Sequence, residues 1–362
     1  MATREATWAY RDRHSEDFAR TYFRSFDGDA VSSIGLGTYL GDATDAADAA
    51  YREAVGAALE AGINVLDTAI NYRHQRSERA VGAALADADV DREAVLLATK
   101  GGFVPFDGTR PDDPAAYVRD AFLESGLVDP ADLARGQHCI APDFLDDQFD
   151  RSLANLGVET LDLYYVHNPE TQLAVRSRDA VYDQLEAAFT RLEERVAAGD
   201  LRHYGVATWK AFRVPPDHDA YLSLPAVLDR ARAAAAAVGN EGPHLQAIQL
   251  PFNVEMADAF TVAAHEGADG RRSALWYAND AGLDVFTSAS LMQGDLTRGL
   301  PDEVAARLEG ETSAQRAINF ARSAPGVTSA LVGMGSPAHV AENLAAGTYE
   351  PLGADAFDAV FE

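Results

Sequence analysis

Short apolar runs alternate along the chain with longer stretches in which apolar residues recur every three or four positions. The short runs are rich in β-branched and aromatic residues, as expected of strands buried on both faces. They lie at residues 31–39, 64–69, 94–101, 161–167, 203–209, 245–253, 283–291 and 328–334. The longer stretches predict amphipathic helices. These lie at residues 46–62, 77–88, 141–157, 179–199, 224–239, 271–282, 313–324 and 337–347.

Strands that alternate with helices in this way predict a (β/α)8 barrel, also called a TIM barrel. Several of the helical stretches end on glycine, the usual residue just past a helix end. We expect one barrel domain over residues 1–362, with its core at about residues 31–346.

Two segments fall outside the repeat. The first, "RSFDGDAVSS", precedes the first predicted strand, and its Asp27-Gly28 pair indicates a hairpin. The second is a long loop at 101–142 that follows the third strand and is rich in Pro, Gly and Asp. Loops of this length are uncommon unless they have a function, so it is either a lid over a substrate site or a surface decoration.

The chain carries 57 acidic against 30 basic residues, a net charge of −27. Such a surface repels phosphates, so nucleic acids and anionic membranes are poor partners. Only two of the bases are lysines, Lys100 and Lys210. An acid excess with few lysines resembles the proteins of halophilic organisms, in which salt screens the self-repulsion. A lysine retained in such a chain is therefore a candidate for a chemical role.

The single cysteine, Cys139, excludes a disulfide framework and indicates a reducing compartment, which we take to be the cytoplasm. The first residues contain no apolar signal-peptide core, and no apolar run is long enough to span a membrane. The motif "GQHC" brings His138 next to Cys139, but no second pair at metal-ligand spacing accompanies it. We therefore expect no zinc site.

Four chemically capable residues follow successive predicted strands. Asp67 ends the second strand, and Tyr72 lies in the loop after it. Lys100 ends the third strand and His167 ends the fourth. Each has an ordinary explanation when taken alone, such as a helix cap or a solvated charge. Because chemistry in such barrels takes place at the strand ends, the four together predict one pocket.

These side chains suit general acid–base catalysis at a carbonyl group. A phenol with a pKa near 10 is a weak acid, but a neighbouring ammonium stabilises the phenolate and lowers that pKa. Asp67 can hold the Lys100 ammonium beside Tyr72, and His167 can orient a substrate oxygen. None of these residues supplies electrons, so a hydride has to come from a cofactor.

Several motifs together resemble the aldo-keto reductase superfamily, in order, from about residue 31 to 346. They are "IGLGTY", "GINVLDTAINY", "RSERAVGAAL", "LATKGG", "LDLYYVHNPE", "GVATW" and "VTSALVGMGSPAHVAENL". The resemblance implies a barrel with a hairpin at its N-terminal end and an enzyme that interconverts an aldehyde or ketone and an alcohol with NADPH or NADH. It also implies that Tyr72 is the proton donor, that Lys100 and Asp67 tune it, and that His167 orients the carbonyl.

The same resemblance implies a set of cofactor-binding residues. These are Thr208, Gln249, Ser288, Gln293, Gly294, Leu296, Gly333, Ser336, His339, Glu342 and Asn343. Ser288 stands where the family has a tyrosine that stacks on the nicotinamide, and Phe252 and Trp209 are candidates to replace it. Arg322 is a further polar candidate.

The residues expected at the 2′-phosphate differ from those of the family, whose members usually prefer NADPH. Gly333 and His339 replace the lysine and arginine that many members use for the 2′-phosphate. This phosphate is bound well only by cationic groups, and a histidine is mostly neutral at neutral pH. We expect a weakened NADP preference, with both NADP and NAD accepted, and NADP binding that tightens in acid as His339 gains charge.

Two alternatives compete with a carbonyl reductase that acts on a small-molecule substrate. "GLGTYLG" looks like a dinucleotide fingerprint, but a Rossmann helix starts inside the glycine motif, and here the helical pattern begins only at about Asp45. The second alternative is a non-catalytic regulatory barrel that binds a nicotinamide nucleotide and partners another protein. The complete set of four residues favours the enzyme, and the altered nicotinamide contacts favour the regulatory barrel. The sequence indicates no oligomeric state.

Overall fold

A computed structural model describes residues 1–361 of the chain. Within them, eight parallel strands close into a barrel in the order β11-β12-β3-β4-β5-β6-β7-β8. They are β3 (Ile34–Gly37), β4 (Val65–Asp67), β5 (Leu96–Gly101), β6 (Leu161–His167), β7 (Leu201–Ala207), β8 (Leu245–Pro251), β11 (Asp284–Ser288) and β12 (Val327–Gly333). Each overlaps an apolar run of the sequence, so the prediction of a (β/α)8 barrel is confirmed.

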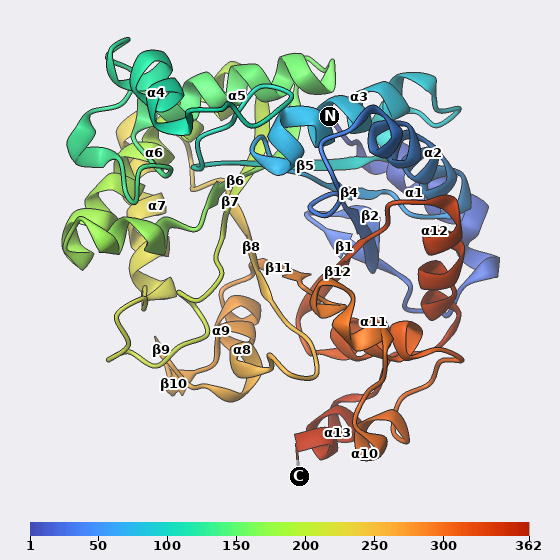
Figure 1. Cartoon of the computed structure of the whole chain (residues 1–362). Coiled ribbons are helices and arrows are strands. Elements are labelled where there is room, and N and C mark those ends of the chain that lie inside the picture. The colour runs from blue at the N-terminus through green and yellow to red at the C-terminus, as the bar shows by residue number, and fades with distance from the viewer. Residues whose placement is uncertain (362) are drawn as a thin grey trace.

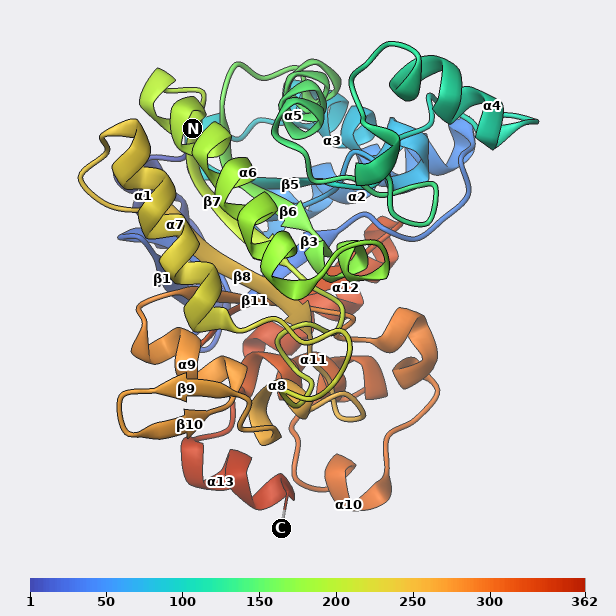
Figure 2. The same cartoon turned by 90° about the vertical axis from the view of Figure 1, so that its left-hand side faces the viewer.

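A helix follows each barrel strand along the chain, and these helices surround the strands (Figures 1 and 2). They are α2 (Asp45–Ala61), α3 (Arg76–Asp87), α5 (Pro142–Leu156), α6 (Arg178–Ala198), α7 (Leu224–Val238), α9 (Ala274–Asp280), α11 (Ser313–Ser323) and α12 (Pro337–Leu344). Side-chain oxygens of Thr44 and Ser177 cap the first turns of α2 and α6. The shorter helices are α1 (Arg4–His14), α4 (Pro114–Val118), α8 (Asp258–Thr261), α10 (Asp302–Ala305) and α13 (Ala354–Asp358).

One predicted helix begins later than its pattern suggested. The expected range was 271–282, but α9 starts at Ala274, and the residues before it form a hairpin instead. Its strands, β9 (His265–Gly267) and β10 (Gly270–Arg272), pair antiparallel and stand out from the barrel in Figure 2. Strands of three residues are too short to show an alternating pattern, although the Asp269-Gly270 pair is a turn signal.

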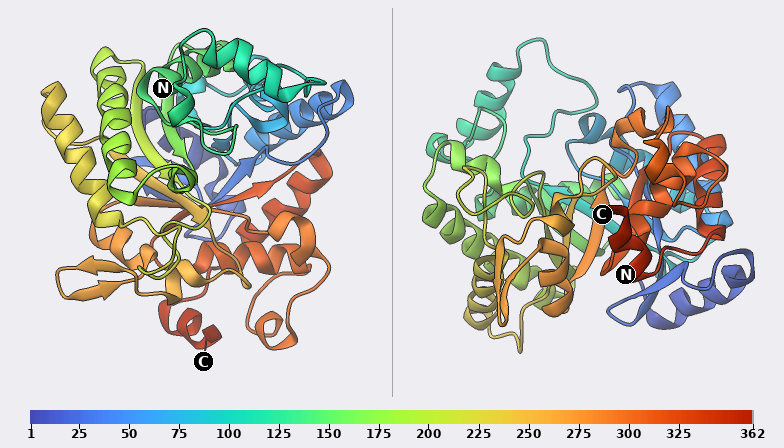
Figure 3. Two further views of the ribbon diagram at one scale, coloured as in Figure 1. Left: turned by 60° about the vertical axis from the view of Figure 1, so that its left-hand side comes forward. Right: turned by 90° about the horizontal axis from the view of Figure 1, so that it is seen from below.

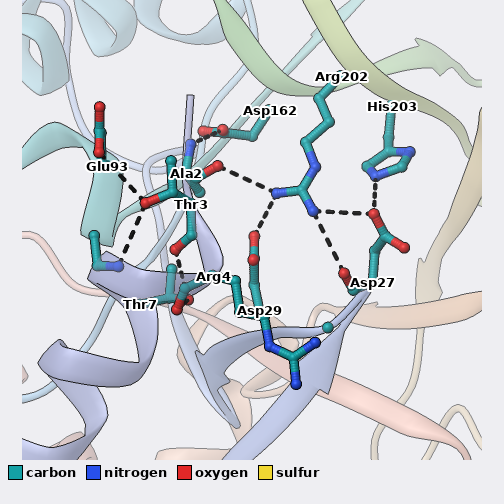
Figure 4. A network of polar contacts seen from close by, with 12 residues as sticks. Ala2, Thr3, Arg4, Thr7, Asp27, Asp29, Glu93, Asp162, Arg202 and His203 are labelled. Carbon is teal, nitrogen blue, oxygen red and sulfur yellow. Dashed lines mark hydrogen bonds and ion pairs between the residues drawn. The ribbon is translucent and has the colours of Figure 1, made fainter.

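The N-terminal end of the barrel is closed by the predicted hairpin of β1 (Phe23–Phe26) and β2 (Asp29–Ser32). Asp27 and Gly28 form its turn with φ values of 44° and 86°, as such two-residue turns require. Figure 4 shows how polar contacts hold the hairpin: the Arg202 guanidinium binds Asp27 and Asp29. The opposite end of the barrel, at the carboxyl ends of the strands, is open and contains a cavity.

Apolar side chains form one core between the strands and the helices and a second core inside the barrel. Tyr165 and Phe286 fill the interior, together with Phe26 from the hairpin. The C-terminal α13 lies outside the ring of strands (Figure 3), where Phe357 packs its ring 5.2 Å from the ring of Phe320. Within residues 1–361, no helix is both long and apolar enough to span a membrane.

Candidate active site

A cavity of about 870 Å³ opens at the carboxyl ends of the barrel strands. The last residues of β3, β4, β6, β7, β11 and β12 all line it: Gly37, Asp67, His167, Ala207, Ser288 and Gly333. This is the end at which sites in (β/α)8 barrels are built, because the loops after the strands converge there. The cavity is large enough to take a small-molecule ligand.

The four predicted catalytic residues lie close together: Asp67, Tyr72 and His167 line this cavity, and the buried Lys100 contacts Asp67. Nζ of the fully buried Lys100 is 2.6 Å from Oδ1 of Asp67 and donates to the carbonyl oxygen of Thr68 at 2.8 Å. The same nitrogen lies 4.9 Å from the centre of the Tyr72 ring. The His167 ring is also near the phenol, with ring centres 6.0 Å apart and the ring planes at 76°. The chain therefore places a buried cation, its counter-ion and an imidazole around one phenol.

The loop after β4 places Tyr72 in this group. Asp67 still pairs in the barrel, next to Gly37 of β3 and Ala98 of β5. The chain then turns sharply, because Arg73 and His74 have left-handed φ values of 48° and 60°. The buried Arg73 guanidinium binds Asp48 of α2 at 2.5 Å and so anchors the turn to the outer helices.

The electrostatics of the four residues differ in one respect from the sequence expectation. Burial raises the pKa of Tyr72 well above its usual value, and the Asp67 carboxylate raises it further. Burial lowers the pKa of Lys100, an effect that Asp67 opposes. Burial, with the Lys100 charge, holds the pKa of His167 well below 6.5. The expected lowering of the phenol pKa by Lys100 is therefore not found here: Tyr72 is a protonated phenol and His167 a neutral imidazole.

Gln249 connects the four predicted catalytic residues to the predicted cofactor side of the cavity. Its Nε2 donates a hydrogen bond to Oδ2 of Asp67 at 2.8 Å, so that Asp67 accepts from Gln249 and Lys100 at its two oxygens. The Gln249 side chain also lines the cavity. A substitution of Gln249 is therefore expected to alter the environment of Lys100, because both side chains bind the Asp67 carboxylate.

Most of the other predicted cofactor residues line the same cavity. They are Thr208, Ser288, Gln293, Gly294, Gly333, His339, Glu342 and Asn343. Leu296 and Ser336 do not line it: the Leu296 side chain is buried, and the Ser336 hydroxyl accepts a hydrogen bond from the His339 backbone nitrogen as the N-cap of α12. Of the two candidates for stacking, Trp209 lines the cavity, whereas Phe252 is buried against Phe320. Arg322 also lies elsewhere, buried against backbone carbonyls such as that of Ala346.

Several residues that line the cavity were not singled out from the sequence. They are Tyr39, Asn71, Phe103, Gln137 and Asn168. Asn71 and Asn168 directly adjoin Tyr72 and His167, and this adjacency was a signal that could have found them. Oδ1 of Asn71 and Oγ1 of Thr208 are buried without a hydrogen-bond partner among the described residues. Buried polar groups normally have partners, so these two atoms fit a cavity that takes a polar ligand.

Comparisons with known proteins concern the family and the fold of the chain. The sequence model of the Aldo/keto reductase family matches residues 33–215. A 6-dehydroglucose reductase from Novosphingobium aromaticivorans is 32% identical over 188 residues, which cover 50% of this chain and 49% of that reductase. The chain thus spans about half the length of this relative.

Two further relatives match over most of their length. A putative voltage-gated potassium channel subunit beta from Schizosaccharomyces pombe is 22% identical over 336 residues, or 90% of this chain and 87% of that protein. A crystal structure of an aldo/keto reductase from Klebsiella pneumoniae in complex with NADP and acetate has a TM-score of 0.60 at 21% identity, with 94% of each chain covered. The structural likeness concerns the fold.

Proposed function

The chain belongs to the aldo/keto reductase family, and from this premise we propose that it is an NAD(P)(H)-dependent oxidoreductase that interconverts an aldehyde or ketone and the corresponding alcohol. The observation that carries the proposal is the Asp67–Lys100 pair beneath the Tyr72 ring, with His167 beside the same phenol at the cavity wall. Burial of an ion pair costs desolvation free energy. Buried charges that shift the pKa of a neighbouring acid are therefore concentrated at functional sites.

The chemistry that a bound nicotinamide supplies is hydride transfer. The neutral His167 can donate a hydrogen bond to the carbonyl oxygen and hold it near the phenol. Tyr72 gives its proton to this oxygen as negative charge develops there. The raised pKa of Tyr72 keeps the proton on the phenol until that moment, and the Lys100 ammonium then stabilises the phenolate.

The residues along the cavity fit a nicotinamide cofactor. The orphan hydroxyl of Thr208 and the amide of Gln249 offer polar contacts near the catalytic group, as a carboxamide needs. Gln293 and Gly294 border the cavity from the turn after β11, and Asn343 borders it from α12. Trp209, with 41% of its surface exposed, is the predicted stacking candidate that lines the cavity.

The far end of the cavity supports a weakened preference for NADP. It is bordered by Gly333, His339 and Glu342, and within the described part of the chain no lysine or arginine lines the cavity. A carboxylate in this position suits a ribose hydroxyl better than a 2′-phosphate. We propose that both cofactors are accepted, with a discrimination of less than about ten- to a hundred-fold.

An absorbance assay at the band of reduced nicotinamide tests the proposed function. The protein is mixed in high salt with NADH or NADPH and a panel of aldehydes and ketones, and loss of absorbance is followed with and without protein. Oxidation of the cofactor that depends on both protein and carbonyl compound supports the proposal. Cofactor binding without oxidation for any compound of the panel contradicts it.

The second candidate is a non-catalytic barrel that binds a nicotinamide nucleotide and partners another protein. The similarity over 90% of the chain to the channel subunit beta favours it. Tight nucleotide binding without turnover, together with co-purification of a partner, would distinguish it from the enzyme.

A further inference from the structure

The long loop between β5 and α5 is a packed wall of the cavity. Its two ends pair with each other: the Val104 nitrogen donates to the Gln137 oxygen, and the Cys139 nitrogen donates to the Gly102 oxygen, both at 2.8 Å. It also has an apolar cluster of its own, formed by Val104, Val118, Phe122, Val128, Cys139 and Phe144. The loop is therefore held in place close to the catalytic residues.

His138 of this loop contacts the backbone of His167. The His138 side chain is fully buried, and its Nε2 lies 2.7 Å from the carbonyl oxygen of His167. Gly102 makes room for this contact. It has a φ of 139°, and a Cβ there would lie 2.8 Å from the same carbonyl oxygen and 3.2 Å from Nε2 of His138.

The hydrogen bonds around Gln172 fix the tautomer of His138. Nε2 of Gln172 lies 2.9 Å from the backbone oxygen of His138 and 3.2 Å from that of Asp132. Both are carbonyl oxygens, so the group that faces them has to be the NH₂ of the amide. The same NH₂ is 3.0 Å from Nδ1 of His138. The His167 carbonyl oxygen, 2.7 Å from Nε2, can only accept, so the imidazole proton lies on Nε2, and Nδ1 faces the NH₂ of Gln172 without a proton of its own.

The contacted carbonyl lies at a strained point of the chain. Asn168, the next residue, has a left-handed φ of 49°, which is uncommon outside glycine. The Phe103 ring packs against both histidine rings, with ring centres 4.8 Å from His138 and 5.0 Å from His167. The orientation of the His167 side chain thus depends on a backbone segment that is fixed by the hydrogen bond from His138 of the loop.

We propose that His138 is a positioning residue for His167: its neutral imidazole donates a hydrogen bond to the His167 carbonyl and so holds the His167 ring toward Tyr72. The inference rests on the proposed function for its effect on catalysis. It also rests on hydrogen bonds that can be observed without any turnover.

The kinetic test uses His138→Phe, which keeps a ring but has no donor, and His138→Gln, which can place an amide donor near the position of Nε2. The expected result for His138→Phe is a kcat roughly 10- to 100-fold lower with a Kd for cofactor within about two-fold of wild type. Partial recovery of kcat is expected in His138→Gln.

His265 supplies the matched control. It is also fully buried and binds a backbone carbonyl, that of Phe212 at 2.8 Å, but it is the first residue of β9, next to α7 and outside the cavity lining. His265→Phe should lower the Tm without a change in kcat. If His138→Phe lowers the Tm but leaves kcat at the wild-type value, the positioning role is overturned.

A spectroscopic measurement separates this inference from the proposed function. In ¹⁵N NMR spectra of the cofactor-free protein, His138 should carry its proton on Nε2 at neutral pH. In Gln172→Leu this tautomer preference should weaken. A proton on Nδ1 of His138 in the wild type overturns the inference, even if the protein reduces no carbonyl compound.

Discussion

The ammonium nitrogen of Lys100 lies 4.9 Å from the centre of the Tyr72 ring, so the cation faces the ring of the proposed proton donor. Asp67 binds this ammonium at 2.6 Å and neutralises part of its charge. In the resting state burial therefore prevails, and the pKa of Tyr72 is raised. The cation becomes most effective when Tyr72 loses its proton, because the attraction to a phenolate exceeds that to a neutral ring.

Replacement of Lys100 by methionine removes this cation and keeps an unbranched side chain. The apparent pKa of the catalytic acid should rise, and reduction at neutral pH should slow, because the phenolate loses its stabilising charge. The measurement is the pH profile of kcat. Lys210→Arg is the control, since Lys210 is exposed and does not line the cavity. Equal behaviour of the two variants would show that Lys100 has no special role.

The charge of the cavity should select among carbonyl compounds. No lysine or arginine from the described residues lines it, and the chain has a net charge of −27. An anionic substrate therefore has no cation to pair with and should be disfavoured. We expect kcat/KM for a neutral aldehyde to exceed that for a carboxylate-bearing analogue of similar size by about ten-fold or more. An equal or higher value for the anion, in low and high salt, would contradict this account of the cavity.

A cation at position 339 should change the choice of cofactor. His339 is exposed on the first turn of α12 and lines the cavity. His339→Arg should tighten NADP binding by about ten-fold, since an arginine can pair with the 2′-phosphate, and should change NAD binding little. Titrations of both cofactors measure this. Ala338→Arg adds the same charge at an exposed neighbour that does not line the cavity, and a similar gain there would assign the effect to overall charge.

The stability of the fold should depend on pH through His138. Burial lowers the pKa of His138 to about 4, whereas an unfolded histidine titrates near about 6.5. Between these values the unfolded chain binds a proton that the folded chain does not, so the free energy of unfolding falls as the pH falls. The loss should be about 3 kcal/mol over this interval.

Denaturant unfolding of the wild type and of His138→Gln at several pH values between 7 and 4 measures this contribution. The wild type should lose more stability than the variant as the pH is lowered. If the difference in the free energy of unfolding between the two proteins stays constant with pH, the stability change does not come from His138.

The sequence predicted those parts of the protein that follow from local pattern. The barrel strands are short apolar runs, and residues at or near their carboxyl ends meet at one end of a barrel, which is why Asp67, Lys100 and His167 could be grouped with Tyr72. The hairpin turn at Asp27-Gly28 was likewise a local signal. The pairing of Lys100 with Asp67 was expected from the position of both residues near strand ends, whereas the contact with the Thr68 carbonyl oxygen was not.

Other features depend on which distant groups meet, and these could not be predicted. The raised pKa of Tyr72 results from its burial and from the nearby Asp67 carboxylate, and only the structure shows both effects. Leu296 turned inward and Ser336 became a helix cap, although both stand in loops that border the cavity. His138 was considered only as a possible metal ligand, because nothing local links it to the backbone of His167.

The central claim is that this protein transfers hydride to a carbonyl carbon while Tyr72 supplies the proton. The most direct measurement follows deuterium from C4 of a reduced nicotinamide cofactor into the product, with the wild type and with Tyr72→Phe. The account predicts an alcohol with deuterium on the carbinol carbon for the wild type. It predicts a rate lower by roughly 10²-fold or more for Tyr72→Phe, with cofactor binding retained. An alcohol without deuterium, or a Tyr72→Phe variant as fast as the wild type, would contradict it.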